Sequence, residues 1–128
     1  MILDASALIA IALDEPEREM LVAKINAADA IAVGAPTLVE AGIVLSARAG
    51  QDASAVLVEL LAVADAVIIE FGQGHWRVAL SAWGRFGTGR HPAGLNFGDC
   101  LAYAAAHVAG EPLLAKSNDF ARTDIALA

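Results

Sequence analysis

The sequence has little cysteine, few aromatic residues and no long apolar run. Its single cysteine, Cys100, excludes a disulfide framework within the chain. Aromatic residues make up only 5% of the 128 positions, so we expect a core of small side chains, alanine above all, between closely packed helices. The purest apolar run, Ala7–Leu13, is far shorter than the ~18 residues of a membrane-spanning helix. No basic leader precedes it, so we expect a cytoplasmic chain without a secretory signal or membrane anchor.

Basic residues are also scarce, with 8 Lys and Arg against 15 Asp and Glu and a formal net charge of −7. This balance argues against a nucleic-acid-binding protein of the usual kind, which carries a basic patch. Most of the imbalance lies in residues 1–74, whereas residues 75–128 are slightly basic. An acidic chain still binds a polyanion where its carboxylates hold a divalent metal ion and a few cations line the approach.

Hydrophobic residues make up 58% of the chain, which excludes intrinsic disorder. Strand-like apolar segments alternate with helical patterns along the whole length, as is typical of a parallel sheet covered on both faces. We therefore predict one α/β domain over residues 1–128. The predicted strands cover residues 2–4, 30–33, 66–69 and 112–115. The predicted helices cover residues 7–13, 34–48, 53–64, 75–86 and 97–108, and a further helix starts within residues 14–17.

Two acids in the first third of the chain lie in apolar surroundings. Asp4 ends the first predicted strand, at the edge where open parallel sheets bind ligands. The alternative interpretation is that Asp4, or Ser6, caps the following helix. Glu40 lies on a predicted helix with Ile43 and Val44 on its own face, where an unpaired carboxylate would be unfavourable.

Two further acids occupy comparable positions later in the chain. Asp99 follows Asn96 by three residues, which resembles a capping box, and it projects along the apolar face of its predicted helix. Asp119 follows the last predicted strand and so returns to the same edge of the sheet. The alternative interpretation of Asp119 is a solvated loop acid.

Together the four acids predict a metal site. Like charges held close to one another raise each other's pKa, and a bound hard cation removes this conflict. Oxygen ligands favour Mg²⁺ or Mn²⁺ over zinc, and ions of this kind activate water for in-line attack at phosphorus. The candidate phosphate contacts are Arg90, in a glycine-rich loop, and Lys116, after the last predicted strand.

These segments resemble the PIN-domain family, and more narrowly the VapC ribonuclease toxins of type II toxin–antitoxin modules. The resemblance spans nearly the whole chain in the right order. Its most specific part is the Leu-Asn-Phe-Gly-Asp-Cys block at residues 95–100. The other parts are the opening Ile-Leu-Asp-Ala-Ser-Ala-Leu, Glu40 on the third predicted helix, and Pro-Leu-Leu-Ala-Lys-Ser-Asn-Asp-Phe at residues 112–120.

The resemblance implies a three-layer α/β/α domain with a central parallel sheet of four to five strands. It also implies Mg²⁺- or Mn²⁺-dependent cleavage of RNA phosphodiester bonds. The family's catalytic acids match Asp4, Glu40, Asp99 and Asp119. Of these, Asp4 and Asp99 match the principal metal ligands. Many PIN domains carry the fourth acid where this chain has Ser117, and Asn118 is an alternative, neutral ligand.

The resemblance implies partners as well. These are a second copy of the chain in a homodimer, and a cognate VapB antitoxin whose C-terminal segment blocks the active-site groove. DNA would be contacted only through the antitoxin. Two other hypotheses stay open. One is a catalytically inactive PIN-like module that serves only for interaction. The other is an aspartyl-phosphate hydrolase with Asp4 as nucleophile, although the second aspartate of that motif is absent, because Ser6 stands at that position.

Overall fold

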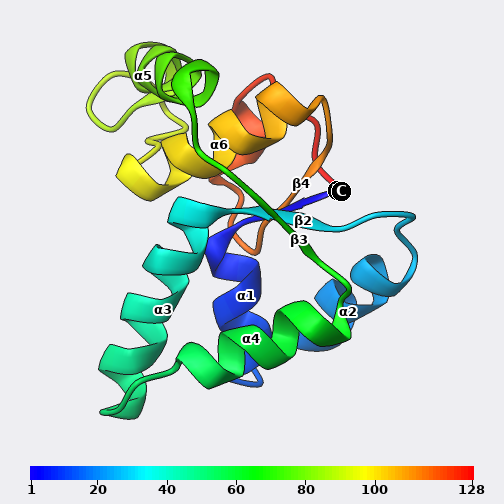
Figure 1. Ribbon diagram of the computed structural model, residues 1–128. Coiled ribbons are helices and arrows are strands. Elements are labelled where there is room, and N and C mark those ends of the chain that lie inside the picture. Colours follow the sequence, from blue (N-terminus) through cyan, green and yellow to red (C-terminus); the bar gives the residue numbers. More distant parts are fainter.

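A four-stranded parallel sheet runs through the centre of the molecule (Figure 1). The computed structural model describes residues 1–128. The strands lie in the order β3-β2-β1-β4, and every pairing between neighbours is parallel. Their bounds are β1 Ile2–Leu3, β2 Ala32–Gly34, β3 Val67–Ile69 and β4 Leu113–Leu114. All four predicted strands are therefore present, each displaced or shortened by one or two residues at its ends.

Helices cover both faces of this sheet, which confirms the predicted three-layer α/β/α architecture. The first four helices lie on one face and the last two on the other (Figure 1). Their bounds are α1 Ala5–Ala12, α2 Arg18–Asn26, α3 Ala35–Ala49, α4 Ser54–Val63, α5 Gln73–Phe86 and α6 Phe97–Ala109. None of these helices combines the length and apolarity that crossing a membrane requires.

Alternation along the short strands divides the core into two parts. Leu3 and Leu114 face the helices α1 to α4, whereas their neighbours Ile2 and Leu113 face α5 and α6. Small side chains let α6 lie close to the sheet, as the composition predicted. Four of its alanines are fully buried, namely Ala102, Ala104, Ala105 and Ala106.

The helix predicted to start within residues 14–17 is present, but it begins one residue later than predicted. The helix α2 begins at Arg18, and Glu17 makes no capping hydrogen bond through its side chain. Asp14 adopts a left-handed backbone conformation with φ of 54°, which a right-handed helix does not contain. The side chains of Glu15 and Glu17 instead form ion pairs with Lys116. Pro16 and the acids beside it therefore precede α2 instead of forming its first turn.

The strand order reverses its direction at β1. From β1 the chain moves outward to β2 and β3 on one side, and it returns through α5 and α6 to β4 on the other side of β1. Such a reversal of strand order is the topological switch point, where parallel sheets bind ligands at the carboxyl ends of their strands. Asp4 directly follows β1 at this point, and Asp119 lies in the segment that follows β4.

The segment after β4 is anchored to the second core. It contains a short 3-10 helix, η1, spanning Asp119–Arg122, in which Phe120 is fully buried against the α6 side of the sheet. Beyond η1, Asp124 accepts hydrogen bonds at 2.6 Å from the Tyr103 hydroxyl and from the Arg85 guanidinium. These contacts hold Asp119 at the carboxyl edge of the sheet.

We expect the substitution Phe120→Ala to lower the free energy of unfolding by about 3–5 kcal/mol, because it removes a fully buried aromatic ring. Urea denaturation measures this change. The matched control is Phe97→Ala, since Phe97 is 78% exposed and its removal should change stability by roughly 0.5 kcal/mol or less. Equal effects of the two substitutions would contradict the anchoring role of Phe120.

Candidate functional site

Asp4 is held at the switch point by its backbone and by its side chain. Its N–H donates to the carbonyl of Leu114 at 2.9 Å, which ties it to the end of β4. It is the N-cap of α1, and its Oδ2 accepts from the N–H of Ser6 at 2.9 Å and from the Ser6 hydroxyl at 2.5 Å. The side chain is nearly inaccessible, and this burial raises the pKa of Asp4 despite the two bonds from Ser6.

Asp99 occupies the first turn of α6, where the capping box predicted from the sequence is present. Its N–H donates to Asn96 Oδ1 at 2.9 Å, and its Oδ2 accepts from the Asn96 N–H at 2.8 Å. Burial raises the pKa of Asp99, the Asn96 N–H opposes this, and the charges of Asp4 and Asp119 raise it further. In Asp4 and Asp99 alike, the capping bonds go to Oδ2, and Oδ1 accepts no hydrogen bond from the protein.

Glu40 reaches the same place from the second turn of α3. Its carboxylate lies directly against Gly98 in the first turn of α6. Burial raises the pKa of Glu40, and the charges of Asp4 and Asp99 add to this effect. The surroundings differ from the sequence prediction, since Ile43 on the same helix is 65% exposed. The core-facing positions of α3 are Thr37, Ala41 and Leu45, and the contact with α6 is what half-buries Glu40.

Asp119 completes the group of acids. It is exposed at the start of η1, and its negative charge contributes to the raised pKa values of both Asp4 and Asp99. The structure therefore brings together all four acids that the sequence singled out. Asp4 follows β1 and Asp119 lies in the segment after β4. Glu40 lies on α3, and Asp99 lies on α6.

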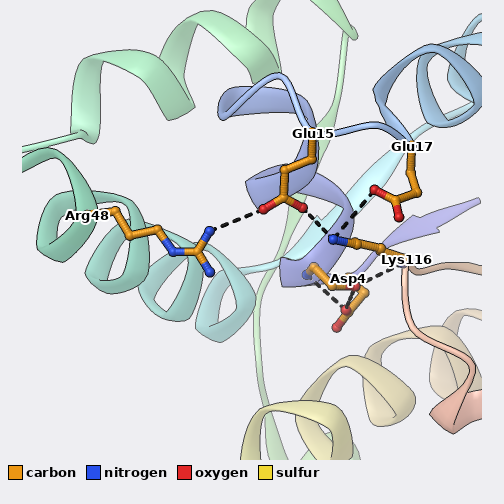
Figure 2. Close-up of polar contacts among 6 residues, drawn as sticks. Asp4, Glu15, Glu17, Arg48 and Lys116 are labelled. Carbon is orange, nitrogen blue, oxygen red and sulfur yellow. Dashed lines mark hydrogen bonds and ion pairs between the residues drawn. The ribbon is translucent and has the colours of Figure 1, made fainter.

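The predicted phosphate contacts lie in different surroundings. Lys116 follows β4, and its N–H donates to the Ser6 hydroxyl at 3.0 Å. Its Nζ forms ion pairs with the carboxylates of Glu15 at 2.6 Å and Glu17 at 3.5 Å (Figure 2). Arg48 of α3 binds the other oxygen of Glu15 at 3.2 Å. The positive charge of Lys116 is thus already compensated.

Sequence reasoning missed this ion-pair network. Arg48 and Lys116 are 33 and 101 residues from Glu15, so no local pattern could have indicated the contacts. Arg90 differs from Lys116, because it lies exposed in the turn between α5 and α6 and its side chain has no carboxylate within ion-pair distance.

The chemistry of these side chains fits a hard divalent cation. Every charged group at the site offers oxygen. Burial is the main cause of the raised pKa values of Asp4, Glu40 and Asp99, the charges of neighbouring acids add to it, and a bound cation would favour the ionised forms. No three His, Cys, Asp or Glu side chains are already close enough together to enclose an ion. Mg²⁺ does not require such a cluster, because it binds through one or two carboxylates and keeps several waters.

We expect Glu40→Gln to stabilise the metal-free protein at pH 7. The folded-state pKa of Glu40 lies above its ordinary value of 4.5, so ionisation is less favourable in the folded than in the unfolded chain. Well below pH 4.5 both states hold the proton, and wild type and variant should differ little in stability. As the pH rises through the raised pKa, the wild type should lose stability relative to the variant.

Denaturation in chelator from pH 3 to pH 8 measures this difference. The control is Glu59→Gln, which changes an exposed glutamate of α4 and should show no such trend. A Glu40→Gln variant that is less stable than wild type at pH 7 would mean that the carboxylate has a stabilising partner in the fold.

Comparison with known proteins identifies relatives along the whole chain. Residues 1–126 match the PIN domain family. Ribonuclease VapC28 of Mycobacterium tuberculosis is 42% identical over 126 residues, which cover 98% of this chain and 95% of that protein. Ribonuclease VapC36 of the same organism is 39% identical, with 98% and 91% of the two chains covered.

Solved structures agree in fold. A crystal structure of Mycobacterium tuberculosis VapC20, described as a Sarcin-Ricin loop cleaving toxin, superposes with a TM-score of 0.80 at 13% identity and covers 99% of this chain and 97% of its own. A toxin-antitoxin complex from Klebsiella pneumoniae has a TM-score of 0.72 at 17% identity, with 99% and 95% covered. With the sequence relatives, these findings show that the chain belongs to the PIN domain family and, within it, to the VapC ribonucleases.

Proposed function

We propose that this protein is a divalent-metal-dependent endoribonuclease that acts as the toxin of a type II toxin–antitoxin module. One observation carries the proposal. In a chain whose relatives are named VapC ribonucleases, Asp4, Glu40 and Asp99 converge at the switch point of the sheet, and each has a raised pKa. This arrangement is suited to holding a cation and a phosphodiester together.

Asp4 and Asp99 are the proposed ligands of Mg²⁺ or Mn²⁺. When bound, the cation supplies a lowered pKa for water and a positive charge that neutralises the phosphoryl oxygens. Ser6 and Asn96 orient the two aspartates through the capping bonds to Oδ2. We assign to the Glu40 carboxylate the orientation of the attacking water and the acceptance of its proton. Asp119, exposed at the open side of the group, completes the catalytic acids.

Arg90 and Lys116 are the proposed contacts to RNA phosphates. Arg90 is the stronger candidate, because no carboxylate compensates its charge. Lys116 would have to leave Glu15 and Glu17 before its ammonium group could bind a phosphate. We expect its contribution to substrate binding to be smaller.

We propose the remaining features from the family. Residues 1–128 act as a single PIN domain in the cytoplasm, where the chain forms a homodimer and a VapB-type antitoxin inhibits it. The Klebsiella pneumoniae neighbour is a toxin-antitoxin complex, which supports a protein partner of this class. Contact with DNA would be made through the antitoxin.

Cleavage of labelled total RNA by the purified protein tests the proposed function. We expect discrete fragments with Mg²⁺ or Mn²⁺ and none with EDTA. Asp99→Asn should reduce the rate by about 100-fold or more, which is the scale of losing one preorganised charged group. The amide can still accept the Asn96 N–H, so the cap of α6 survives the substitution.

The matched control is Asp29→Asn, which changes an exposed aspartate between α2 and β2 and should leave the rate unchanged. Cleavage that survives in Asp99→Asn would contradict the assigned site. A folded, metal-loaded protein that cleaves no RNA would favour the interaction module.

The proposed phosphate contacts can be tested separately through the salt dependence of RNA affinity. Arg90→Ala should weaken RNA binding and reduce the slope of log affinity against log salt concentration by roughly one, the effect of losing one phosphate contact. Fluorescence anisotropy with a labelled RNA and a chelated, non-cleaving protein measures this slope. Arg18→Ala is the control, because Arg18 lies on α2 and is paired with Asp14. An unchanged slope in Arg90→Ala would remove Arg90 from the RNA interface.

A further inference from the structure

Gly98 stands out among the glycines in helices of this protein. It is the second residue of α6, it is buried, and the carboxylate of Glu40 lies directly above its Cα. A Cβ at this position would overlap both carboxylate oxygens of Glu40. At the corresponding second position of α5, a Cβ on Gly74 would meet nothing within 4 Å.

A glycine inside a helix is unfavourable unless a contact requires it, because glycine is among the poorest helix formers. The rest of α6, by contrast, is rich in alanine, which is the best helix former. The backbone conformation gives no reason for glycine either, since Gly98 is helical and does not have a positive φ. The close approach of Glu40 is the remaining reason.

The absent side chain has a consequence for the position of Glu40. Without a Cβ in the way, the carboxylate enters the space between α3 and the amino end of α6, beside Asp4 and Asp99. The obstructed atoms are the end of a flexible side chain, so an added methyl group would displace Glu40 rather than the helix.

We propose that Gly98 is a positioning residue of the active site, and that its lack of a side chain is what admits the Glu40 carboxylate to the group of acids. Its role in cleavage rests on the proposed ribonuclease function, whereas its role in placing Glu40 does not. The competing explanation is that Gly98 serves only the packing of α6 against its neighbours.

A double-mutant cycle separates these explanations. The proteins are wild type, Gly98→Ala, Glu40→Ala and the double variant, with Gly74→Ala as the matched control. Three quantities are measured for each: the rate of RNA cleavage, the affinity for Mn²⁺, and the thermal unfolding midpoint in EDTA. Crystal structures of metal-free wild type and Gly98→Ala give the position of the Glu40 carboxylate directly.

We expect Gly98→Ala to stay folded and to cleave RNA about 100-fold more slowly, because a displacement of about 1 Å at a catalytic group has effects of this size. Its rate and Mn²⁺ affinity should fall to those of Glu40→Ala. In the Glu40→Ala background the same change should have no further effect on either quantity, since the obstructed group is gone. Gly74→Ala should match the wild type.

Three results would overturn the proposal. The first is a Gly98→Ala variant whose rate stays within twofold of wild type and whose Glu40 carboxylate has not moved. The second is an equal loss in the Glu40→Ala background, which would assign Gly98 to packing alone. The third result concerns folding. If Gly98→Ala does not fold, a double variant with Glu40→Ala that also does not fold would show that the added methyl group obstructs something other than Glu40. If the wild type cleaves no RNA, the proposed function fails, and the crystal structures still decide where Gly98 places Glu40.

Discussion

The repulsion between carboxylates at the switch point is the constraint on which the rest of the structure depends. Asp4 is almost inaccessible to water. Burial raises the pKa of Glu40 and of Asp99, and the negative charges of neighbouring acids raise both further. A fold does not gather such groups without opposing forces. Here hydrogen bonds from Ser6 and Asn96 hold the two aspartates. The charge that remains uncompensated is what a divalent cation would neutralise.

The same residues thus serve the fold and the proposed chemistry. Capping bonds begin α1 and α6 through Oδ2 of Asp4 and Asp99, and Oδ1 of each stays available. The parallel sheet brings β1 and β4 side by side, which places Asp4 near the segment that carries Asp119. The ion pairs of Lys116 with Glu15 and Glu17 fasten that segment to the turn before α2 (Figure 2). Stability and function are therefore coupled at this edge.

Local patterns are sufficient to predict the layers and the capping box of α6, and they single out the four acids, whose catalytic roles stay a prediction. Periodicity identifies strands and helices, and the Asn96–Asp99 spacing alone indicates a capping box. Periodicity on α3 does not tell which apolar residues face the core, so it misses the exposure of Ile43. The ion pair of Lys116 with Glu15 joins segments about a hundred residues apart in sequence, and the contact of Gly98 with Glu40 joins two helices that are distant in sequence. Such contacts exist only after the chain has folded.

The most direct test of this account is a pH titration of the carboxyl carbons of Asp4, Glu40 and Asp99 by ¹³C NMR, without and with Mg²⁺. In the metal-free protein all three carboxyl groups should titrate above their ordinary pKa values of 3.8 for aspartate and 4.5 for glutamate. Saturating Mg²⁺ should move the titrations of Asp4 and Asp99 to lower pH, because the cation stabilises the ionised forms. Ordinary pKa values in the metal-free protein, or titrations that Mg²⁺ leaves unchanged, would contradict this account.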